Sequence, residues 1–424
     1  MIDSEAAELA QWLQRIEAVH PREIELGLDR VAAVYKALSI PKPATVITVA
    51  GTNGKGSCVA VMERLLSDLG VACGAFSSPH LLRFNERIRI GGEAVSDRQL
   101  CEAFSCIDQA RGEIPLTYFE FGTLAALWIF AEQGVDYALL EVGLGGRLDA
   151  VNIIDADVAV LSSVDLDHQQ WLGDDLETIA REKLGIARSG SALIIGEPRA
   201  LRAIDDFAAE VATVARLGKD FELNDDRYVE SSGFSLAIPD CYFVQPSLAC
   251  ALSALRHTAV AERLPKAVSA LQGGFVPGRF QIEQVNGIEV ILDVAHNPAA
   301  SSLLAERLSK RPKAGRCVSL FAVMADKAID GMVAPMQPVT DAWFLAPLAN
   351  CERALQADDT MRALSAVGEH MISVSKNMKQ AYRRALSLLA EGDRLVVWGS
   401  FYTVAEILPM IEKDQRRTIR HEES

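Results

Sequence analysis

Residues 45–57 read Thr-Val-Ile-Thr-Val-Ala-Gly-Thr-Asn-Gly-Lys-Gly-Ser, a β-branched run that passes into a glycine-rich turn. A helical pattern follows over 57–69, so this stretch predicts a strand, a loop and a helix in that order. The backbone N–H groups of such a loop form a cradle for anions, and Lys55 is placed to reach a phosphate chain. The general phosphate-loop pattern has Gly where Val49 stands, and it lacks the Gly56 that follows the lysine here. The alternative interpretation is a glycine-rich turn with an incidental lysine.

The rest of the chain alternates between strand and helix patterns. Beyond 45–57, the first part predicts strands over 71–77, 136–142 and 157–164 and helices over 5–19, 97–111, 120–133 and 175–188. Residues 211–245 predict short strands and loops, and a second alternation begins with a strand at 288–292. We therefore expect an α/β protein. We expect residues 1–285 to form a P-loop ATPase type of domain with a mostly parallel sheet, and residues 286–424 to form a smaller Rossmann-like α/β domain.

The composition excludes several classes of protein. The 424 residues include 42 Lys and Arg against 57 Asp and Glu, a formal net charge of −15, which argues against nucleic acid or an anionic membrane as a partner. The N-terminus lacks the basic and apolar regions of a signal peptide, and no apolar run reaches about 18 residues. Eight cysteines are scattered without a CxxC pair. These features predict a cytoplasmic protein in a reducing compartment.

Polar residues follow several predicted strands, at the sheet edge where α/β proteins bind ligands. Glu141 ends one strand and suits Mg²⁺, which prefers oxygen ligands, although a solvated strand end is the alternative. His168 follows another strand and is either a ligand, a phosphate-side donor or a structural histidine. Lys183 lies in a helical pattern, where a solvated charge is the usual interpretation. Asp293 and His296 lie in a loop that faces a ligand or, alternatively, caps a helix.

Together these motifs resemble the folate branch of the Mur ligase superfamily, the family of bifunctional dihydrofolate synthase/folylpolyglutamate synthases. The resemblance runs in family order across nearly the whole chain. It is carried by residues 51–57, 77–81, 117–123, 141–152, 166–168, 181–183, 277–281 and 293–298. It implies that ATP phosphorylates a substrate carboxylate and that the amino group of glutamate attacks the acyl phosphate, which leaves an amide, ADP and phosphate.

The resemblance also implies the substrates and ions. Dihydropteroate and reduced folates are the expected acceptors of L-glutamate, with ATP and Mg²⁺ required and K⁺ as an optional further ion. The alternatives are a Mur-type ligase that adds an amino acid to a peptidoglycan precursor and a non-catalytic P-loop protein. The sequence shows no coiled-coil heptads and no long apolar edge, which favours a monomer.

Roles for individual residues follow from the resemblance. The expected nucleotide-binding residues are Thr52, Asn53, Gly54, Lys55, Gly56, Ser57, Ser247, Arg279 and Asp293. The expected Mg²⁺ ligands are Ser78, Glu141 and His168. The expected pterin pocket consists of Leu26, Gly27, Leu28, Thr117, Tyr118, Phe119, Glu120, Leu148, Asp149 and Ala150. The expected catalytic residues are Lys55, His168, Lys183 as a carbamate, and His296 and Ser400 in glutamate handling.

Three positions depart from the family pattern. Ser247 stands where the family has an Asn beside the nucleotide, and a hydroxyl lacks the paired donor and acceptor of an amide. Ala328 replaces the second Asp of an Asp-Lys-Asp motif, and Tyr402 replaces a His. None of the three belongs to the expected phosphoryl-transfer group, so the ligase prediction stands.

Overall fold

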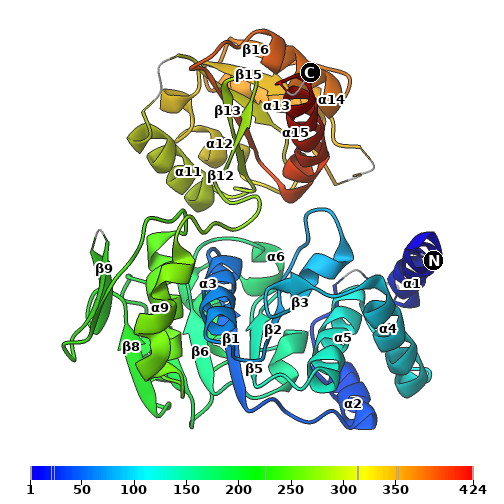
Figure 1. Cartoon of the computed structure of the whole chain (residues 1–424), viewed down its shortest axis with the longest axis vertical. Coiled ribbons are helices and arrows are strands. Elements are labelled where there is room, and N and C mark those ends of the chain that lie inside the picture. The colour runs from blue at the N-terminus through cyan, green and yellow to red at the C-terminus, as the bar shows by residue number, and fades with distance from the viewer. Residues whose placement is uncertain are drawn as a thin grey trace. The chain divides into compact units, whose positions relative to one another are not determined.

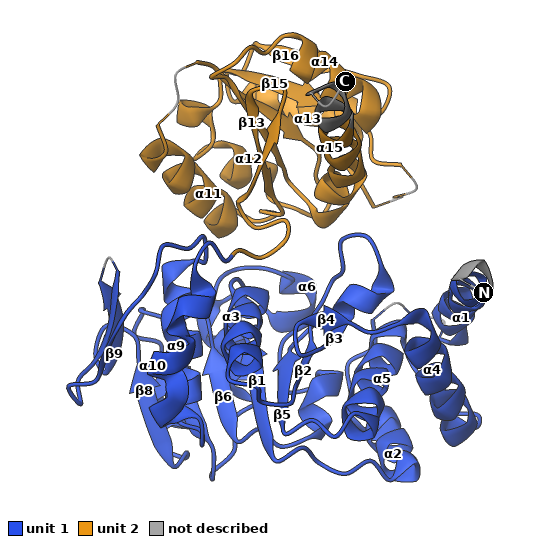
Figure 2. Ribbon diagram, in the orientation of Figure 1, with its two compact units in different colours: residues 1–274 blue, residues 275–424 orange. Residues whose placement is uncertain are grey.

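The computed structural model describes residues 2–422 except 21, 23, 225, 313, 314, 350 and 352. The chain divides into two compact units, residues 1–274 and residues 275–424 (Figure 2). This division precedes the expected boundary at residue 285, because β12 (Gln281–Val285) pairs with β13 (Ile288–Asp293). The pair is a hairpin whose turn residues Asn286 and Gly287 have φ values of 50° and 76°. A boundary at residue 285 would separate the two strands of that hairpin.

One sheet organises the described part of the first unit, with eight strands in the order β4-β3-β2-β5-β1-β6-β7-β8 (Figure 1). The strands are β1 (Thr45–Ala50), β2 (Cys73–Phe76), β3 (Ile88–Ile90), β4 (Glu93–Ala94), β5 (Tyr137–Glu141), β6 (Val158–Leu161), β7 (Ala192–Ile195) and β8 (Thr213–Arg216). β1 pairs in parallel with β5 and β6, and β3 and β4 are antiparallel additions at one edge. The expected mostly parallel sheet is confirmed, and the carboxyl ends of β1, β5 and β6 share one edge.

Helices cover both faces of this sheet. They are α1 (Ile2–Val19), α2 (Asp29–Leu38), α3 (Lys55–Asp68), α4 (Asp97–Arg111), α5 (Tyr118–Glu132), α6 (Gln169–Leu172), α7 (Leu176–Leu184), α8 (Arg202–Ala208), α9 (Gln245–Arg256) and α10 (Leu264–Ala267), with 3₁₀ turns η1 (Phe84–Arg87), η2 (Ala150–Ile153), η3 (Ala261–Arg263) and η4 (Val268–Leu271). α3 packs on α9, and α4 packs on α5. Val46 and Leu140 of the sheet share one hydrophobic core with Phe121 and Phe130 of α5. Since both faces are buried, β1 and β5 are apolar along most of their length.

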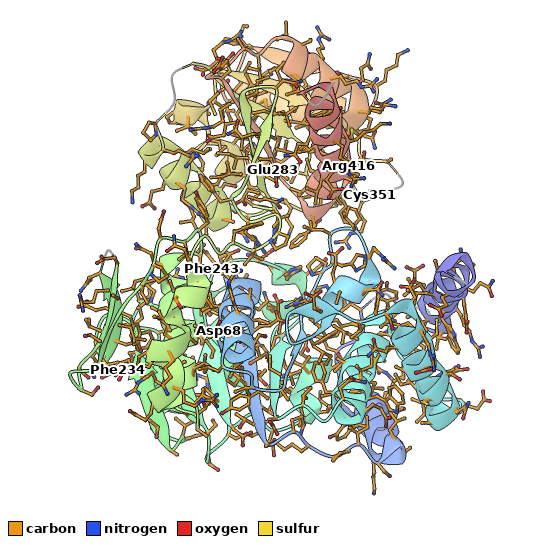
Figure 3. The ribbon with its side chains drawn as sticks, in the orientation of Figure 1. Asp68, Phe234, Phe243, Glu283, Cys351 and Arg416 are labelled. Carbon is orange, nitrogen blue, oxygen red and sulfur yellow. The ribbon has the colours of Figure 1, made fainter. Side chains whose placement is uncertain are left out.

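A small antiparallel sheet occupies the region in which the sequence predicts short strands and loops. It consists of β9 (Phe221–Asn224), β10 (Arg227–Glu230) and β11 (Ser235–Ala237). Arg256 of α9 holds it in place: its guanidinium lies 3.7 Å from the ring centroid of Phe234, and its Nε donates to Glu230 at 3.1 Å. Phe234 is labelled in Figure 3.

In the second unit the described residues form a sheet of six strands in the order β12-β13-β17-β14-β15-β16. Besides β12 and β13, its elements are β14 (Cys317–Phe321), β15 (Ala342–Leu345), β16 (Ile372–Val374), β17 (Arg394–Trp398), α11 (Pro298–Lys310), α12 (Ile329–Val333), α13 (Ala357–Ala366), α14 (Met378–Ser387), α15 (Phe401–Glu422) and η5 (Gln337–Val339). β12 lies at one edge of the sheet and is antiparallel to β13. The neighbours β13 and β17, β17 and β14, β14 and β15, and β15 and β16 are all parallel pairs. The rings of Phe321 and Trp398, tilted by 35° with centroids 4.4 Å apart, belong to its hydrophobic core.

No helix among the described residues combines the length and the apolar character needed to cross a membrane.

Candidate functional site at the carboxyl edge of the first sheet

The glycine loop of residues 51–57 joins β1 to α3, as the sequence predicts, and it is anchored to the segment that follows β6. Thr52 N donates to Ser163 O at 2.9 Å, and Asn53 N donates to Ser163 Oγ at the same distance. Ser162 Oγ donates to Asn53 O at 2.7 Å. These two serines were not among the site residues predicted from the sequence. The available signal was a pair of small hydroxyl residues directly after a strand expected at the centre of the sheet.

Two glycines of the loop allow close approach to predicted site residues. Gly54 has a φ of 86°, and a Cβ at this position would lie 2.6 Å from Ser247 Oγ. At Gly56 a Cβ would lie 3.3 Å from Glu141 Oε2. A side chain at either position would therefore push the loop away from its neighbour. The structure thus brings Ser247 and Glu141 to the glycine loop.

Lys55 begins α3 and turns its ammonium group back over the loop. Its Nζ donates to Gly51 O at 2.9 Å and to Thr52 O at 3.4 Å. The charge of Lys55 also lowers the pKa of Lys183 and favours the ionised form of Asp149. Three predicted site residues from three separate segments therefore lie within electrostatic reach of one another.

Glu141 lies at the end of β5 and is 5% exposed. Its Oε2 accepts a hydrogen bond from Ser78 N at 3.3 Å, so two of the three predicted metal ligands lie together. His168 follows β6 with a left-handed φ of 51°, and its ring Nε2 lies 4.0 Å from Asp167 Oδ2. Within the described ranges, no group of three or more His, Cys, Asp or Glu side chains is able to hold a metal ion. One buried carboxylate beside a phosphate-binding type of loop nevertheless fits Mg²⁺, which takes few protein carboxylates and shares substrate phosphates.

Lys183 is the last cation of α7 and is 4% exposed. Burial, followed by the charge of Lys55, lowers its pKa to about 7, while Asp167 and Asp149 oppose this shift. Its neighbour Glu182 pairs with Arg147 instead, at 2.8 Å. The solvated position considered from the sequence is therefore not what the fold produces, and an amine with this pKa is about half neutral at pH 7.

Two of the predicted pterin segments meet at the loop after β5. Gly27 N donates to Leu148 O at 3.3 Å, which places residues 26–28 beside residues 148–150. The buried carboxylate of Asp149 accepts hydrogen bonds from Gly143 N at 3.0 Å, Leu144 N at 2.9 Å and Val151 N at 3.0 Å. Burial raises the pKa of Asp149 to about 6 in spite of these donors. Asp149 thereby orders the loop, and its contact with substrate stays a prediction.

The third pterin segment, residues 117–120, begins α5. Thr117 and Glu120 form a capping box, in which Thr117 N donates to Glu120 Oε2 at 2.7 Å and Glu120 N donates to Thr117 Oγ1 at 3.2 Å. Glu120 also pairs with Arg30 at 3.1 Å. Phe119 packs against Gly143, where a Cβ would lie 2.7 Å from its ring, and Tyr118 meets Phe84 edge-on. These contacts fix the segment, and its substrate-binding role remains a prediction.

In the second unit, Asp293 ends β13 and organises the adjacent turn. Its carboxylate accepts hydrogen bonds from Phe280 N and Ala295 N, both at 2.8 Å. Burial raises its pKa, and the nearby positive charge of Arg279 acts in the opposite direction. The turn adopts an uncommon backbone, since Phe280 has a φ of 47°.

The remaining predicted residues of the second unit are Arg279, His296 and Ser400, and they lie beside Phe401. The Arg279 guanidinium lies 5.3 Å from its ring centroid, and the His296 ring lies 6.0 Å from it. Ser400 is buried at the start of α15, where its Oγ accepts a hydrogen bond from Thr403 N at 3.1 Å. The observed task of Ser400 is thus to cap a helix, and its part in glutamate handling stays a prediction.

Known proteins that are similar to this chain show the family to which it belongs. The curated dihydrofolate synthase/folylpolyglutamate synthase of Escherichia coli K12 is 41% identical over 419 residues, which cover 97% of each chain. This chain belongs to the dihydrofolate synthase/folylpolyglutamate synthase family. The member from Haemophilus influenzae is 36% identical and spans 95% of this chain and 98% of its own. Residues 278–401 match the family model described as the Mur ligase glutamate ligase domain.

Solved structures of the synthase family share the whole fold. Escherichia coli FolC in complex with DHPP and ADP superposes with a TM-score of 0.90 at 40% identity, and covers 97% of this chain and 99% of that one. A bifunctional folylpolyglutamate synthase/dihydrofolate synthase with Mn, AMPPNP and L-glutamate bound has a TM-score of 0.86 at 37% identity, over 95% and 98% of the chains. The resemblance drawn from the sequence is confirmed. Neither a peptidoglycan-precursor ligase nor a non-catalytic P-loop protein is favoured.

Proposed function

We propose that this protein joins L-glutamate to dihydropteroate, giving dihydrofolate, and to the γ-carboxylate of reduced folates, giving folylpolyglutamates. One observation carries the proposal: the glycine loop packs against buried Glu141, and the charge of Lys55 in that loop acts on buried Lys183. This combination occurs in a chain that matches a synthase of that name along 97% of its length. Relatives solved with DHPP and ADP, and with Mn, AMPPNP and L-glutamate, support the same choice of ligands.

The reaction needs activation because a carboxylate at neutral pH is a poor electrophile towards amines. Transfer of the terminal phosphoryl group of ATP to the substrate carboxylate gives an acyl phosphate. The glutamate amine then forms the C–N bond, the C–O bond to phosphate breaks, and the amine loses a proton. Residues 52–57 hold the phosphates through backbone N–H groups, and Lys55 stabilises the negative charge that develops on the transferred group.

The divalent cation belongs beside Glu141. Ser78, Glu141 and His168 would hold Mg²⁺, which supplies neutralisation of phosphate charge when it is bound. Ser247 sits against Gly54 and would contact the nucleotide there. Arg279 and Asp293 in the second unit would contribute further nucleotide contacts, and His296 and Ser400 would handle glutamate.

Lys183 would work as a carbamate rather than as an ammonium. Its neutral amine reacts with CO₂ to form an N–C bond and releases a proton to solvent, which reverses the sign of the side chain. Burial and the lowered pKa of about 7 support this, because an ordinary lysine remains protonated at neutral pH.

Three finer statements complete the proposal. The enzyme works in the cytoplasm, as a monomer, with K⁺ as an optional further ion. The eight free cysteines support a reducing compartment. Light scattering on the purified protein measures its mass in solution, and turnover in K⁺ compared with Na⁺ buffers measures the dependence on the monovalent ion.

Product analysis by mass spectrometry tests the function directly. The protein is incubated with ATP, Mg²⁺ and L-glutamate, and with dihydropteroate, a reduced monoglutamyl folate or a uridine-nucleotide peptide precursor in separate reactions. We expect addition of one glutamyl residue to dihydropteroate and of one or more to the folate, each with release of phosphate. Turnover with the nucleotide peptide alone would instead assign a peptidoglycan-type ligase.

A further inference from the structure

The loop that follows β5 lies directly against the carboxyl end of α7, where Lys183 is located. A Cβ at Gly146 would lie 2.6 Å from Lys183 O, so the two backbones are in van der Waals contact. Arg147 N donates to Glu182 O at 2.8 Å. The position of the Lys183 backbone is therefore tied to the conformation of this loop.

One buried side chain connects the two segments. Asn152 is 6% exposed, and its Nδ2 donates to Arg147 O in the loop at 3.0 Å and to Gly185 O after α7 at 3.1 Å. Its Oδ1 accepts a hydrogen bond from Arg188 at 2.9 Å. The amide oxygen and both N–H groups of Asn152 are thus hydrogen-bonded, and the two N–H groups join the loop to the residue after α7.

The Arg147–Glu182 ion pair joins the same two segments but is expected to contribute less. The side chains are 52% and 23% exposed, and exposed ion pairs add little because water and salt screen them. Removal of the buried Asn152 donors takes a hydrogen bond from Arg147 O and leaves Gly185 O with the donor of Arg188 at 3.0 Å, and the loss of a buried hydrogen bond costs more than the loss of an exposed ion pair. Of these two side-chain connections between the loop and the end of α7, Asn152 is therefore the stronger, and it acts beside the backbone hydrogen bond from Arg147 N to Glu182 O.

We propose that Asn152 is a positioning residue of the reaction, which holds the end of α7 so that the Lys183 side chain is carboxylated by CO₂ in the site. In this step the Nζ–C bond forms, the π bond of one C=O group of CO₂ breaks and its electron pair passes to that oxygen, and one Nζ proton passes to solvent. A shift of the helix end displaces the Lys183 amine from Lys55 and Asp149 by a similar distance, which is why a residue that touches no substrate affects the reaction. The inference rests on the proposed function and on the carbamate within it.

The test compares Asn152→Asp with the wild type. The aspartate keeps the shape of the side chain and its acceptor for Arg188, while it removes both donors. Arg181→Ala is the control, because Arg181 lies on the exposed side of α7 and pairs with Asp206 at 3.2 Å. The readouts are the carbamate signal in carbon-13 NMR after equilibration with labelled bicarbonate, and the bicarbonate concentration that gives half-maximal activity.

We expect Asn152→Asp to lower kcat about 10- to 100-fold, the usual range for groups that orient a reacting side chain. Its carbamate signal should be weaker, and it should need more bicarbonate, while Arg181→Ala matches the wild type. A purely structural role would lower thermal stability without moving the bicarbonate dependence. Equal carbamate occupancy and equal bicarbonate dependence in Asn152→Asp and wild type would overturn the inference, as would a wild type without any carbamate signal.

If Asn152→Asp does not fold, a second pair of variants tests whether the position of the loop against the end of α7 controls Lys183. Gly146→Ala forces the loop away from Lys183 O, whereas Gly190→Ala has no atom within 4 Å of the added methyl group. We expect only the first to shift the bicarbonate dependence, and an unshifted value in Gly146→Ala overturns the inference. The carbamate signal does not depend on turnover, so failure of the proposed ligase activity is seen separately, as a wild type that forms no glutamyl product.

Discussion

Thr52 and Asp165 bind each other through a single hydroxyl group. Asp165 N donates to Thr52 Oγ1 at 2.8 Å, and Thr52 Oγ1 donates to Asp165 O at 3.2 Å. The first residue belongs to the glycine loop, and the second belongs to the segment that leads to His168. This double contact joins the loops after β1 and β6, two neighbouring strands of the sheet. The contact fixes the position of the expected phosphate-binding loop relative to the segment that carries His168, an expected metal ligand.

Substitution of Thr52 by valine should therefore weaken nucleotide binding. Valine keeps the shape but leaves Asp165 N without its acceptor, so we expect a loss of about 1 kcal/mol in unfolding free energy and a higher KM for ATP. Thr52→Ser keeps the hydroxyl and should behave like the wild type. Denaturant unfolding and ATP titrations measure both effects, and identical values for Thr52→Val and Thr52→Ser would show that the contact is dispensable.

Lys55→Ala should nearly abolish turnover and leave the fold intact. Loss of one electrostatic donor to a developing charge costs about 10²- to 10³-fold in rate. Lys42→Ala is the matched control, since Lys42 is an exposed cation paired with Asp157 at 3.2 Å. Phosphate release in steady state measures both variants. Wild-type turnover by Lys55→Ala would remove the phosphate-site assignment.

Lys183→Ala and Lys183→Arg should both lose most activity, because neither side chain forms a carbamate. A small carboxylate added in solution should restore part of the activity of the alanine variant only. If the ammonium were the working group, arginine would retain activity. Crystallographic density should extend beyond the wild-type Nζ by a planar, three-atom group, and density that ends at Nζ in an active crystal supplied with bicarbonate would contradict the carbamate.

The lowered pKa of Lys183 predicts that its carbamate occupancy depends on pH. The pKa of Lys183 is about 7 in the folded protein against an ordinary 10.5, so its neutral form is lost as the pH falls below about 7. Because CO₂ reacts with the neutral amine, carbamate occupancy at constant dissolved CO₂ should fall over that range. Carbon-13 NMR between pH 6 and pH 8.5 measures it, and occupancy that does not vary with pH would show that the amine is not in titration equilibrium with solvent.

Asp149 makes the stability of the first unit depend on pH. Its pKa is about 6 when folded against 3.8 as a free side chain, so the folded state binds the additional proton. The stabilising contribution of this group is present below about pH 4 and is lost as the pH rises through 6, an effect on the order of 3 kcal/mol. The unfolding free energy of wild type relative to Asp149→Asn should therefore fall from pH 4 to pH 7. A difference that stays constant would refute the assigned pKa.

Asp293→Ala should destabilise the second unit and raise the KM for ATP. The substitution leaves Phe280 N and Ala295 N without an acceptor, a loss of about 1–3 kcal/mol, and removes the charge beside Arg279. Asp330→Ala, at an exposed position in the first turn of α12, is the control. Calorimetry and ATP kinetics separate the two effects, and an unchanged KM would place the nucleotide contacts elsewhere.

The hairpin of β12 and β13 was not predicted, although the sequence carries a local signal for it. Asn286-Gly287 is the favoured pair for a two-residue hairpin turn, because both residues adopt a positive φ at little cost. That pair predicts β12 beside β13 and would have placed the domain boundary earlier. Other features had no such signal: the contacts of Ser162 and Ser163 with the glycine loop join residues more than 100 positions apart.

The sequence by itself determined the strand, glycine loop and helix around Lys55, the α/β class, and the strand-end position of Glu141. Each of these depends on the spacing of apolar residues and on the backbone freedom of glycine, which are properties of short segments. Only the tertiary structure decided that Lys183 is buried with a lowered pKa, that Asn152 connects its helix to the loop after β5, and that Asp149 orders that loop. Burial and the nearness of charges arise when distant segments pack together, so no local pattern encodes them.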